Sequence, residues 1–225
     1  MTYILSLETS TKVSSVALHN KGVLVGSQQL HIDKSHSGLL TVMIDDLLKC
    51  CGVNLEDLDA VAVSNGPGSY TGLRIGLSTA KGICFGIDKP LITLNTLDIL
   101  EAEVRKYVTD NSRLCPMLDA RRMEVYTQLS EADGETIVDM HPKVIDENSF
   151  HAELNEGTIW FFGSGAAKCR PIISHSNARF VEGIEPLASN MGALAYKAFQ
   201  ENEFADLAYA EPIYLKEFGG RPLSN

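Results

Sequence analysis

The stretch NGPGSYTGLRIGLSTAKG, residues 65–82, decides how this chain folds. A turn rich in glycine leads into an amphipathic helix over 71–86, in which small residues recur at every fourth position. These residues are Gly72, Gly76, Ala80 and Cys84. The spacing fits neither the dinucleotide-binding pattern GxGxxG nor a P-loop, because no GKS or GKT follows. A glycine inside a helix costs about 0.8–1 kcal/mol relative to alanine. Close approach of a second helix offsets that cost, so we expect the strip to serve helix packing first and phosphate contact second.

Strand and helix patterns alternate outward from this stretch, which is typical of an α/β fold. Short apolar runs predict strands, and the run from residue 58 to the glycine turn is apolar enough to be buried on both faces. Apolar residues at helical spacing predict helices, and glycines mark where several of these elements end. The expected strands start near residues 3, 14, 22, 58 and 89, and the expected helices cover 38–51, 71–86 and 96–108.

The layout of the first strands recurs in the second half of the chain. The segments ILSLETSTKVSSVALHNKG and CPMLDARRMEVYTQLSEADG both give an apolar strand, an acid, a polar turn and an alternating strand. The two acids, Glu8 and Asp119, lie about 111 residues apart, as 119 − 8. Repetition of a structural unit predicts two similar lobes, which we place at residues 1–106 and 107–225, the second being the reduced one.

Composition and charge narrow the classes of function. The chain has 19 basic and 29 acidic residues and a net charge of −10, so it is poorly suited to bind nucleic acid by itself. Its five cysteines contain no CxxC pair, which indicates reduced thiols rather than a disulfide framework or a zinc site. The first residues lack the basic head of a signal peptide, and no apolar run is long enough to span a bilayer. We therefore expect a cytoplasmic protein without a membrane partner.

The helix over 38–51 carries more apolar surface than packing on one sheet requires. Its apolar residues fill an arc of about 180°, whereas one buried face takes about 100° or somewhat more. The excess predicts a second apolar contact, made either with another element of the same chain or with a partner protein. For the partner alternative, the expected contact residues of this helix and of the 71–86 helix are Leu39, Leu40, Met43, Leu47, Cys50, Gly72, Leu73, Gly76, Leu77 and Ala80.

Four segments, in this order and spacing, resemble one protein family. They are ILSLETSTKVSSVAL, GPGSYTGLRIGLSTAKG, LDARRMEVY and EPIYLK, and together they are similar to the bacterial TsaB (YeaZ) family. The resemblance implies two lobes of the actin-like ATPase fold (ASKHA, ribonuclease H-like). It also implies a subunit of the machinery that makes threonylcarbamoyladenosine in tRNA. In that family the two helices named above form a seam, which pairs two copies of the chain or one copy with the paralogue TsaD.

The same resemblance implies that this chain is a non-catalytic scaffold and activator. In the catalytic paralogue TsaD, the segment after the matching asparagine reads His-x-Glu-x-His and holds a metal. Here that segment reads NTLDIL, and the two histidine positions hold Thr96 and Leu100. Leucine has no donor atom and a single threonine hydroxyl is a poor ligand, so no metal site is expected. The partners implied are a TsaD-type paralogue and a TsaE-type ATPase, with tRNA bound only through the complex and a homodimer formed when the chain is alone.

The polar turn after the first strand raises the alternative of an enzyme. In kinases of this superfamily hydroxyls at such a turn hold phosphate, and the candidates here are Thr9, Ser10 and Thr11. The matching turn DARRME has no glycine for close approach to a second phosphate. We therefore expect no cofactor of its own and leave weak or interfacial ATP or ADP open. The alternative function is a small ATP-dependent acyl or sugar kinase, with Glu8 or Asp119 as its acid.

Overall fold

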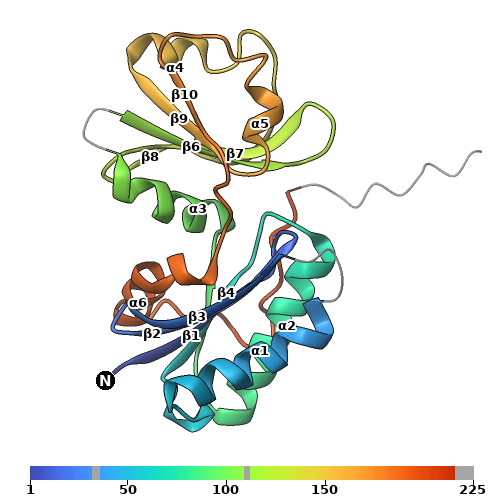
Figure 1. Cartoon of the computed structure of the whole chain (residues 1–225), viewed down its shortest axis with the longest axis vertical. Helices are drawn as coiled ribbons and strands as arrows, with labels where there is room; N and C mark the ends of the chain where they lie inside the picture. Colours follow the sequence, from blue (N-terminus) through green and yellow to red (C-terminus); the bar gives the residue numbers. More distant parts are fainter. Residues whose placement is uncertain (32–35, 109–111, 216–225) are drawn as a thin grey trace, which may run out of the picture.

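The computed structural model describes residues 1–31, 36–108 and 112–215, which form two five-stranded sheets, one in each lobe (Figure 1). The first sheet has the order β3-β2-β1-β4-β5 and the second the order β10-β9-β6-β7-β8. The strands of the first sheet are β1 (Tyr3–Glu8), β2 (Val13–Asn20), β3 (Val23–His31), β4 (Ala60–Ser64) and β5 (Leu91–Leu94). Those of the second are β6 (Ser112–Asp119), β7 (Glu124–Glu131), β8 (Thr136–Val144), β9 (Thr158–Phe162) and β10 (Ala178–Val181).

The two sheets have the same strand order and the same parallel and antiparallel pairing. Within each one the first three strands are antiparallel neighbours, and the first strand then pairs in parallel with the fourth, which pairs in parallel with the fifth. This pattern confirms the α/β class and the repeated layout that the sequence predicts around Glu8 and Asp119. The fold is that of the actin-like ATPases.

Helices cover both faces of the first sheet. In chain order the helices of both lobes are α1 (His36–Cys51), α2 (Tyr70–Ile87), α3 (Thr96–Val104), α4 (His151–Glu156), α5 (Ala166–Cys169) and α6 (Gly192–Gln200), with the 3₁₀ turns η1 (Leu55–Asp57), η2 (Arg105–Tyr107) and η3 (Ala188–Asn190). Of these, α4 and α5 pack on the second sheet. The helices expected over 38–51 and 71–86 are confirmed as α1 and α2, which pack side by side on one face, while α6 packs on the other (Figure 1). Among the described residues, no helix combines the length and apolarity needed to cross a bilayer.

Alternation along β1 explains how one strand serves both faces. Leu5 and Leu7 point into the core beneath α1 and α2, and Ile4 points into the core beneath α6. Both faces are therefore buried, which is why the parallel strand β4 is buried along its whole length.

Helix α3 lies between the two lobes and joins their cores. Ile99 packs in the core beneath α6, whereas Leu97, Leu100 and Val104 pack against Phe162 and other residues of the second sheet. Helix α3 packs mainly on the second sheet. The lobe boundary expected after residue 106 therefore falls between this helix and the sheet that it covers.

The chain also returns to the first lobe after β10. The turn η3 and helix α6 pack on the first sheet. The extended segment after α6, residues 201–215, follows along α2, and we call it the strap. Ala205 N donates to Leu91 O at 2.8 Å and Ile213 N donates to Asn65 O at 2.7 Å, which ties the strap to the start of β5 and to the loop after β4. The second lobe is thus smaller than the expected 107–225, since residues 188–215 lie with the first.

A buried polar network fastens α3 to the second sheet. Gln128 Nε2 donates to Asp98 Oδ1 at 2.7 Å and to Glu101 Oε1 at 2.9 Å. Gln128 Oε1 accepts from Asn95 Nδ2, and Arg105 and Ser130 complete the shell around the Glu101 carboxylate. Burial raises the pKa of both carboxyl groups, so each depends on its hydrogen bonds to remain charged.

Replacing Gln128 by alanine should lower the free energy of unfolding by about 2–3 kcal/mol. The substitution removes the hydrogen bonds that Gln128 makes with the carboxylates of Asp98 and Glu101 and with the Asn95 amide. An unsatisfied buried polar group costs about 1–3 kcal/mol. Denaturant unfolding followed by circular dichroism measures the change. Gln29→Ala, on an exposed position of β3, is the matched control and should stay within about 0.5 kcal/mol of the parent. Equal effects of the two substitutions would contradict the role given to Gln128.

Candidate functional site

Helix α2 sits directly on the turn between β1 and β2. Thr9 Oγ1 donates to Gly72 O at 2.8 Å, and Ser69 N donates to Ser10 O at 2.6 Å. A Cβ added at Gly72 would overlap the carbonyl oxygen of Thr9, and one added at Gly76 would overlap the hydroxyl of the same residue. The glycines on this side of α2 are therefore required for contact with the turn.

This geometry corrects the expectation that the small-residue strip of α2 faces a second helix. The strip Gly72, Gly76, Ala80 and Cys84 is buried against the chain's own first lobe, with Gly76 also against Val63 of β4. The sequence correctly predicts close approach as the reason for the glycines. The element that approaches is the β1–β2 turn rather than a second helix.

The ten residues expected at a partner seam divide into two groups. Eight are buried inside the monomer, most of them in the core beneath α1 and α2: Leu40, Met43, Leu47, Gly72, Leu73, Gly76, Leu77 and Ala80. Leu39 is half-buried and Cys50 is exposed. The apolar arc of α1 is thus largely consumed by the chain's own sheet, so a contact with a partner must use neighbouring side chains.

A second small-residue strip lies on the outer side of α2. Ser78, Gly82 and Gly86 are exposed at spacings of four, and a Cβ at either glycine would meet no atom within 4 Å. Phe85 beside them is 82% exposed, and Val42 on the adjacent helix α1 is 51% exposed. We call this surface the docking face: Val42, Cys50, Ser78, Gly82, Phe85 and Gly86. The spacing 78/82/86 is visible in the sequence, although the expectation above names only the strip at 72/76/80/84.

The strap borders the docking face near the start of α2. Arg74 lies over the ring of Tyr70, with its guanidinium carbon 4.0 Å from the ring centroid, and its Nε donates to Tyr214 Oη at 3.0 Å. Lys81 donates to the carbonyls of Ala208 and Ala210 farther along the same helix. These contacts hold the strap against α2 at two places along the helix.

The phosphate candidates Thr9 and Ser10 are buried, and Thr11 is half-buried. The Thr9 hydroxyl is already committed to Gly72 O, and the Thr11 hydroxyl accepts from Val13 N at 3.3 Å. In this arrangement the loop that starts α2 fills the space above the turn. A phosphate group would have to displace those contacts.

Glu8 is fully buried at the end of β1, next to Ser64 at the end of β4. Its Oε1 accepts from Ser10 N at 2.5 Å, while Glu8 Oε2, Ser10 Oγ and Ser64 Oγ have no hydrogen-bond partner among the described residues. Desolvation raises the pKa of Glu8 to about 7, and the hydrogen bond from the Ser10 amide opposes that shift. A carboxyl group held in this way is half neutral near pH 7 and has no open path to a substrate.

Thr96 and Leu100, the two positions at which the family resemblance implies that metal ligands are replaced, both lie inside the protein. Leu100 belongs to the core between α3 and the second sheet, and Thr96 is buried at the first turn of the same helix. Across residues 1–31, 36–108 and 112–215, no group of three or more His, Cys, Asp or Glu side chains is arranged to hold a metal ion.

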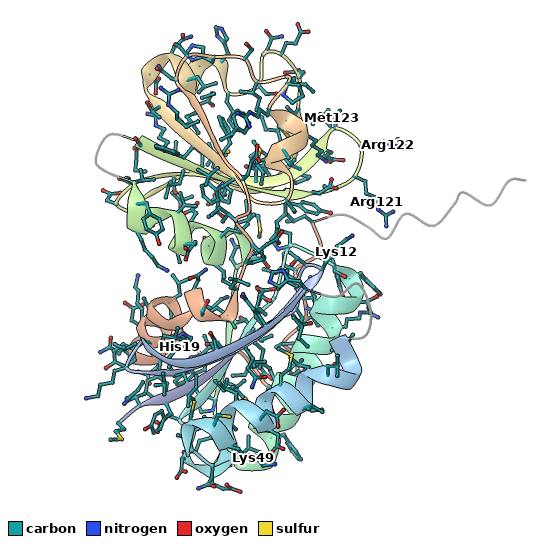
Figure 2. The ribbon with its side chains drawn as sticks, viewed as in Figure 1. Lys12, His19, Lys49, Arg121, Arg122 and Met123 are labelled. Carbon is teal, nitrogen blue, oxygen red and sulfur yellow. The ribbon has the colours of Figure 1, made fainter. Side chains whose placement is uncertain are left out.

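The second polar turn, between β6 and β7, is closed by an ion pair. Asp119 pairs with Lys168 and also accepts from Arg121 N at 2.9 Å. Partial burial would raise the pKa of Asp119, but these two contacts outweigh burial and lower it. Figure 2 shows Arg121, Arg122 and Met123 at the tip of this turn. Asp119 therefore has a partner of opposite charge, whereas at Glu8 the effect of burial dominates.

Comparison with known proteins gives one consistent family. The profile described as tRNA N6-adenosine threonylcarbamoyltransferase (TsaD) matches residues 30–219. The Escherichia coli tRNA threonylcarbamoyladenosine biosynthesis protein TsaB is 30% identical over 95% of this chain and 94% of its own length. The structure of YeaZ from Pseudomonas aeruginosa superposes with a TM-score of 0.81 and 26% identity over 96% of this chain and 100% of that one. An activator of 2-hydroxyisocaproyl-CoA dehydratase from Clostridium difficile, with 11% identity and a TM-score of 0.54 over 94% and 99% of the two chains, shares the fold alone.

The two glycine strips of α2 should respond oppositely to alanine. Gly72→Ala places a methyl group against the Thr9 backbone and should destabilise the protein by about 2 kcal/mol or more, since backbone has to move. Gly82→Ala adds a methyl group in open space and should stabilise the isolated chain by about 0.5–1 kcal/mol through helix propensity. Thermal and denaturant unfolding of the monomeric species give both values. A stabilising effect of Gly72→Ala would refute the close contact.

Burial of Glu8 should make stability fall as pH rises. Its folded pKa of about 7 exceeds the ordinary value of 4.5, so between these values the folded state binds a proton that the unfolded state has lost. The contribution is complete below pH 4.5 and disappears above pH 7. Relative to Glu8→Gln, the parent should lose about 2.5 kcal/mol of unfolding free energy between pH 5 and pH 8. Denaturation curves across this range test it, and parallel pH profiles of the two proteins would contradict it.

Proposed function

Because the chain belongs to the TsaB (YeaZ) family of tRNA threonylcarbamoyladenosine biosynthesis proteins, we propose that it is a non-catalytic scaffold that docks and activates a TsaD-type paralogue. The observation that carries the proposal is the docking face on the outer side of α1 and α2. It is apolar and lined by small residues, and it lies on the two helices that the family resemblance implicates.

Among the residues that the structure describes, none makes a contact with the two outer glycines that offsets their low helix propensity. Each costs about 0.8–1 kcal/mol of helix stability relative to alanine, and neither touches an atom that a methyl group would disturb. A partner helix that approaches along this strip supplies the missing compensation, since small residues let two backbones come close. Phe85 provides a large apolar side chain for such a contact, and exposed aromatic residues are frequent anchors in protein interfaces.

The paralogue is the natural occupant because it shares this fold. Two similar lobes can meet through equivalent helices about a two-fold or nearly two-fold axis, which is the commonest arrangement of paired chains. The same face would join two copies of this chain when the paralogue is absent. A TsaE-type ATPase and tRNA would then bind to the assembled complex, in the cytoplasm, where tRNA is modified.

The chemistry is assigned to the paralogue. Leu100 offers no donor atom, Thr96 is buried, and the Thr9 hydroxyl is engaged by α2. In the family the paralogue TsaD holds the metal and the threonylcarbamoyl-adenylate, and this chain would keep it competent for transfer. The kinase alternative requires a phosphate turn that opens, and it would show as ATP turnover by the isolated chain.

Substitutions on the docking face should abolish pairing without unfolding the chain. Gly82→Leu fills the outer strip and Phe85→Ser removes the apolar anchor, so each should weaken pairing by at least tenfold. Light-scattering mass, measured for the chain alone and mixed with the paralogue from the same organism, reports both pairings. Val144→Ser, on an exposed apolar position of β8 in the other lobe, is the matched control and should leave both unchanged.

Two results would contradict the proposal. A chain that ignores the paralogue, or two variants that pair like the parent, would exclude the docking face. ATP hydrolysis by the isolated chain that Thr9→Val abolishes would instead support the kinase.

A further inference from the structure

The second lobe carries an open hollow that the docking face does not involve. It lies between the end of α5 and β10, has a volume of about 410 Å³, and is lined by Arg170, Ser174, His175, Arg179 and Phe180 among others. This volume accommodates a phosphate group together with the sugar attached to it. The hollow is on the lobe opposite to α1 and α2 (Figure 1), so a ligand here leaves the docking face accessible.

The charge of this segment contrasts with that of the whole chain. Residues 170–179 read RPIISHSNAR, with two arginines, one histidine and no acid, whereas the chain as a whole has a net charge of −10. A local concentration of arginine on an acidic protein attracts anions to one place and leaves the remaining surface repulsive to them.

Arg179 is held in place without losing its charge. Its Nη1 donates to Ser176 O at 2.6 Å and to Ala178 O at 3.1 Å, and both acceptors are neutral carbonyls. Within the described part of the chain no carboxylate pairs with it. A guanidinium fixed in this way retains further N–H groups for a phosphate, which it can bind in a bidentate manner.

His175 presents a donor to the same hollow. Asn177 N donates to His175 Nδ1 at 3.1 Å, so Nδ1 is the acceptor and the neutral ring carries its proton on Nε2. The ring stands edge-on to His151, with centroids 6.0 Å apart, which restricts its orientation. Ser174 also lines the hollow, and a serine hydroxyl is able to donate to a phosphate oxygen.

Arg170 forms the other wall and has one competing acid. Its Nη1 donates to Glu182 Oε1 at 2.6 Å, but both side chains are well exposed, and exposed pairs of this kind contribute at most about 1 kcal/mol. A phosphate can therefore compete for Arg170. Phe180 lies half-buried between these cations and offers an apolar surface to a sugar or base.

We propose that this hollow binds a backbone phosphate of RNA and so provides the second lobe's contact with the tRNA substrate. The inference rests on the proposed function for the identity of the RNA, while the phosphate chemistry rests on the hollow alone. The hollow is open rather than enclosed, which suits one phosphate of a long polymer better than a small molecule that must be buried on all sides.

The test uses the full chain, labelled with ¹⁵N, and an anticodon stem–loop RNA at low salt. Amide shifts should concentrate at residues 170–180. Fluorescence anisotropy from roughly 20 to 200 mM salt should show affinity reduced three- to tenfold by Arg179→Gln or Arg170→Gln, and a log–log salt slope smaller by about 1 for each. Lys49→Gln removes the same charge at the far end of the first lobe (Figure 2) and should change neither quantity.

Three results would overturn the inference. They are no RNA binding at low salt, binding that both arginine variants leave unchanged, and shifts at 170–180 caused by inorganic phosphate but not by RNA. The last would assign the hollow to a free phosphate compound. Light-scattering mass of the same variants with the paralogue separates the two proposals. RNA shifts at the hollow in a chain that fails to pair would preserve this inference and remove the scaffold role.

Discussion

The contact of α2 with the β1–β2 turn is the constraint on which the rest of the first lobe depends. Gly72 and Gly76 let the helix backbone rest on Thr9, and the Thr9 hydroxyl closes the contact on Gly72 O. This approach settles the rotation of α2 about its axis, and it also fills the space above the turn between β1 and β2. One packing requirement thus determines both which surface of α2 faces outward and how closely the turn is covered.

Two small-residue strips on one helix follow from this rotation. The inner strip includes Ala80 and the outer strip Gly82, two residues or about 200° apart, so the strips lie on nearly opposite sides of α2. The inner glycines gain contacts with the β1–β2 turn that offset their helix propensity. The outer glycines gain none from the described residues, because their Cβ positions face open space. The proposed partner would supply the contact that Gly82 and Gly86 lack.

Sequence patterns predicted the helices, the strands and the repeated strand layout. The periodicities of strands and helices can be read from short stretches of sequence, and so can the recurrence around Glu8 and Asp119. They did not predict which apolar residues face the sheet. The arc of α1 exceeds one buried face, and only the position of the sheet decides that Leu40 is core while Val42 is exposed. Sequence patterns also left open whether residues 188–215 return to the first lobe, since nothing local to α6 records which of two similar sheets it covers.

Helix α3 shows how one helix can join two lobes. Ile99 fills the core beneath α6, and Leu100 fills the core against the second sheet. On the adjoining side Glu101 and Gln128 fasten the same helix by hydrogen bonds. Because apolar packing and a buried polar network both act on α3, separating the lobes would expose apolar side chains and leave buried polar groups without partners. The two lobes are therefore held together by this one helix.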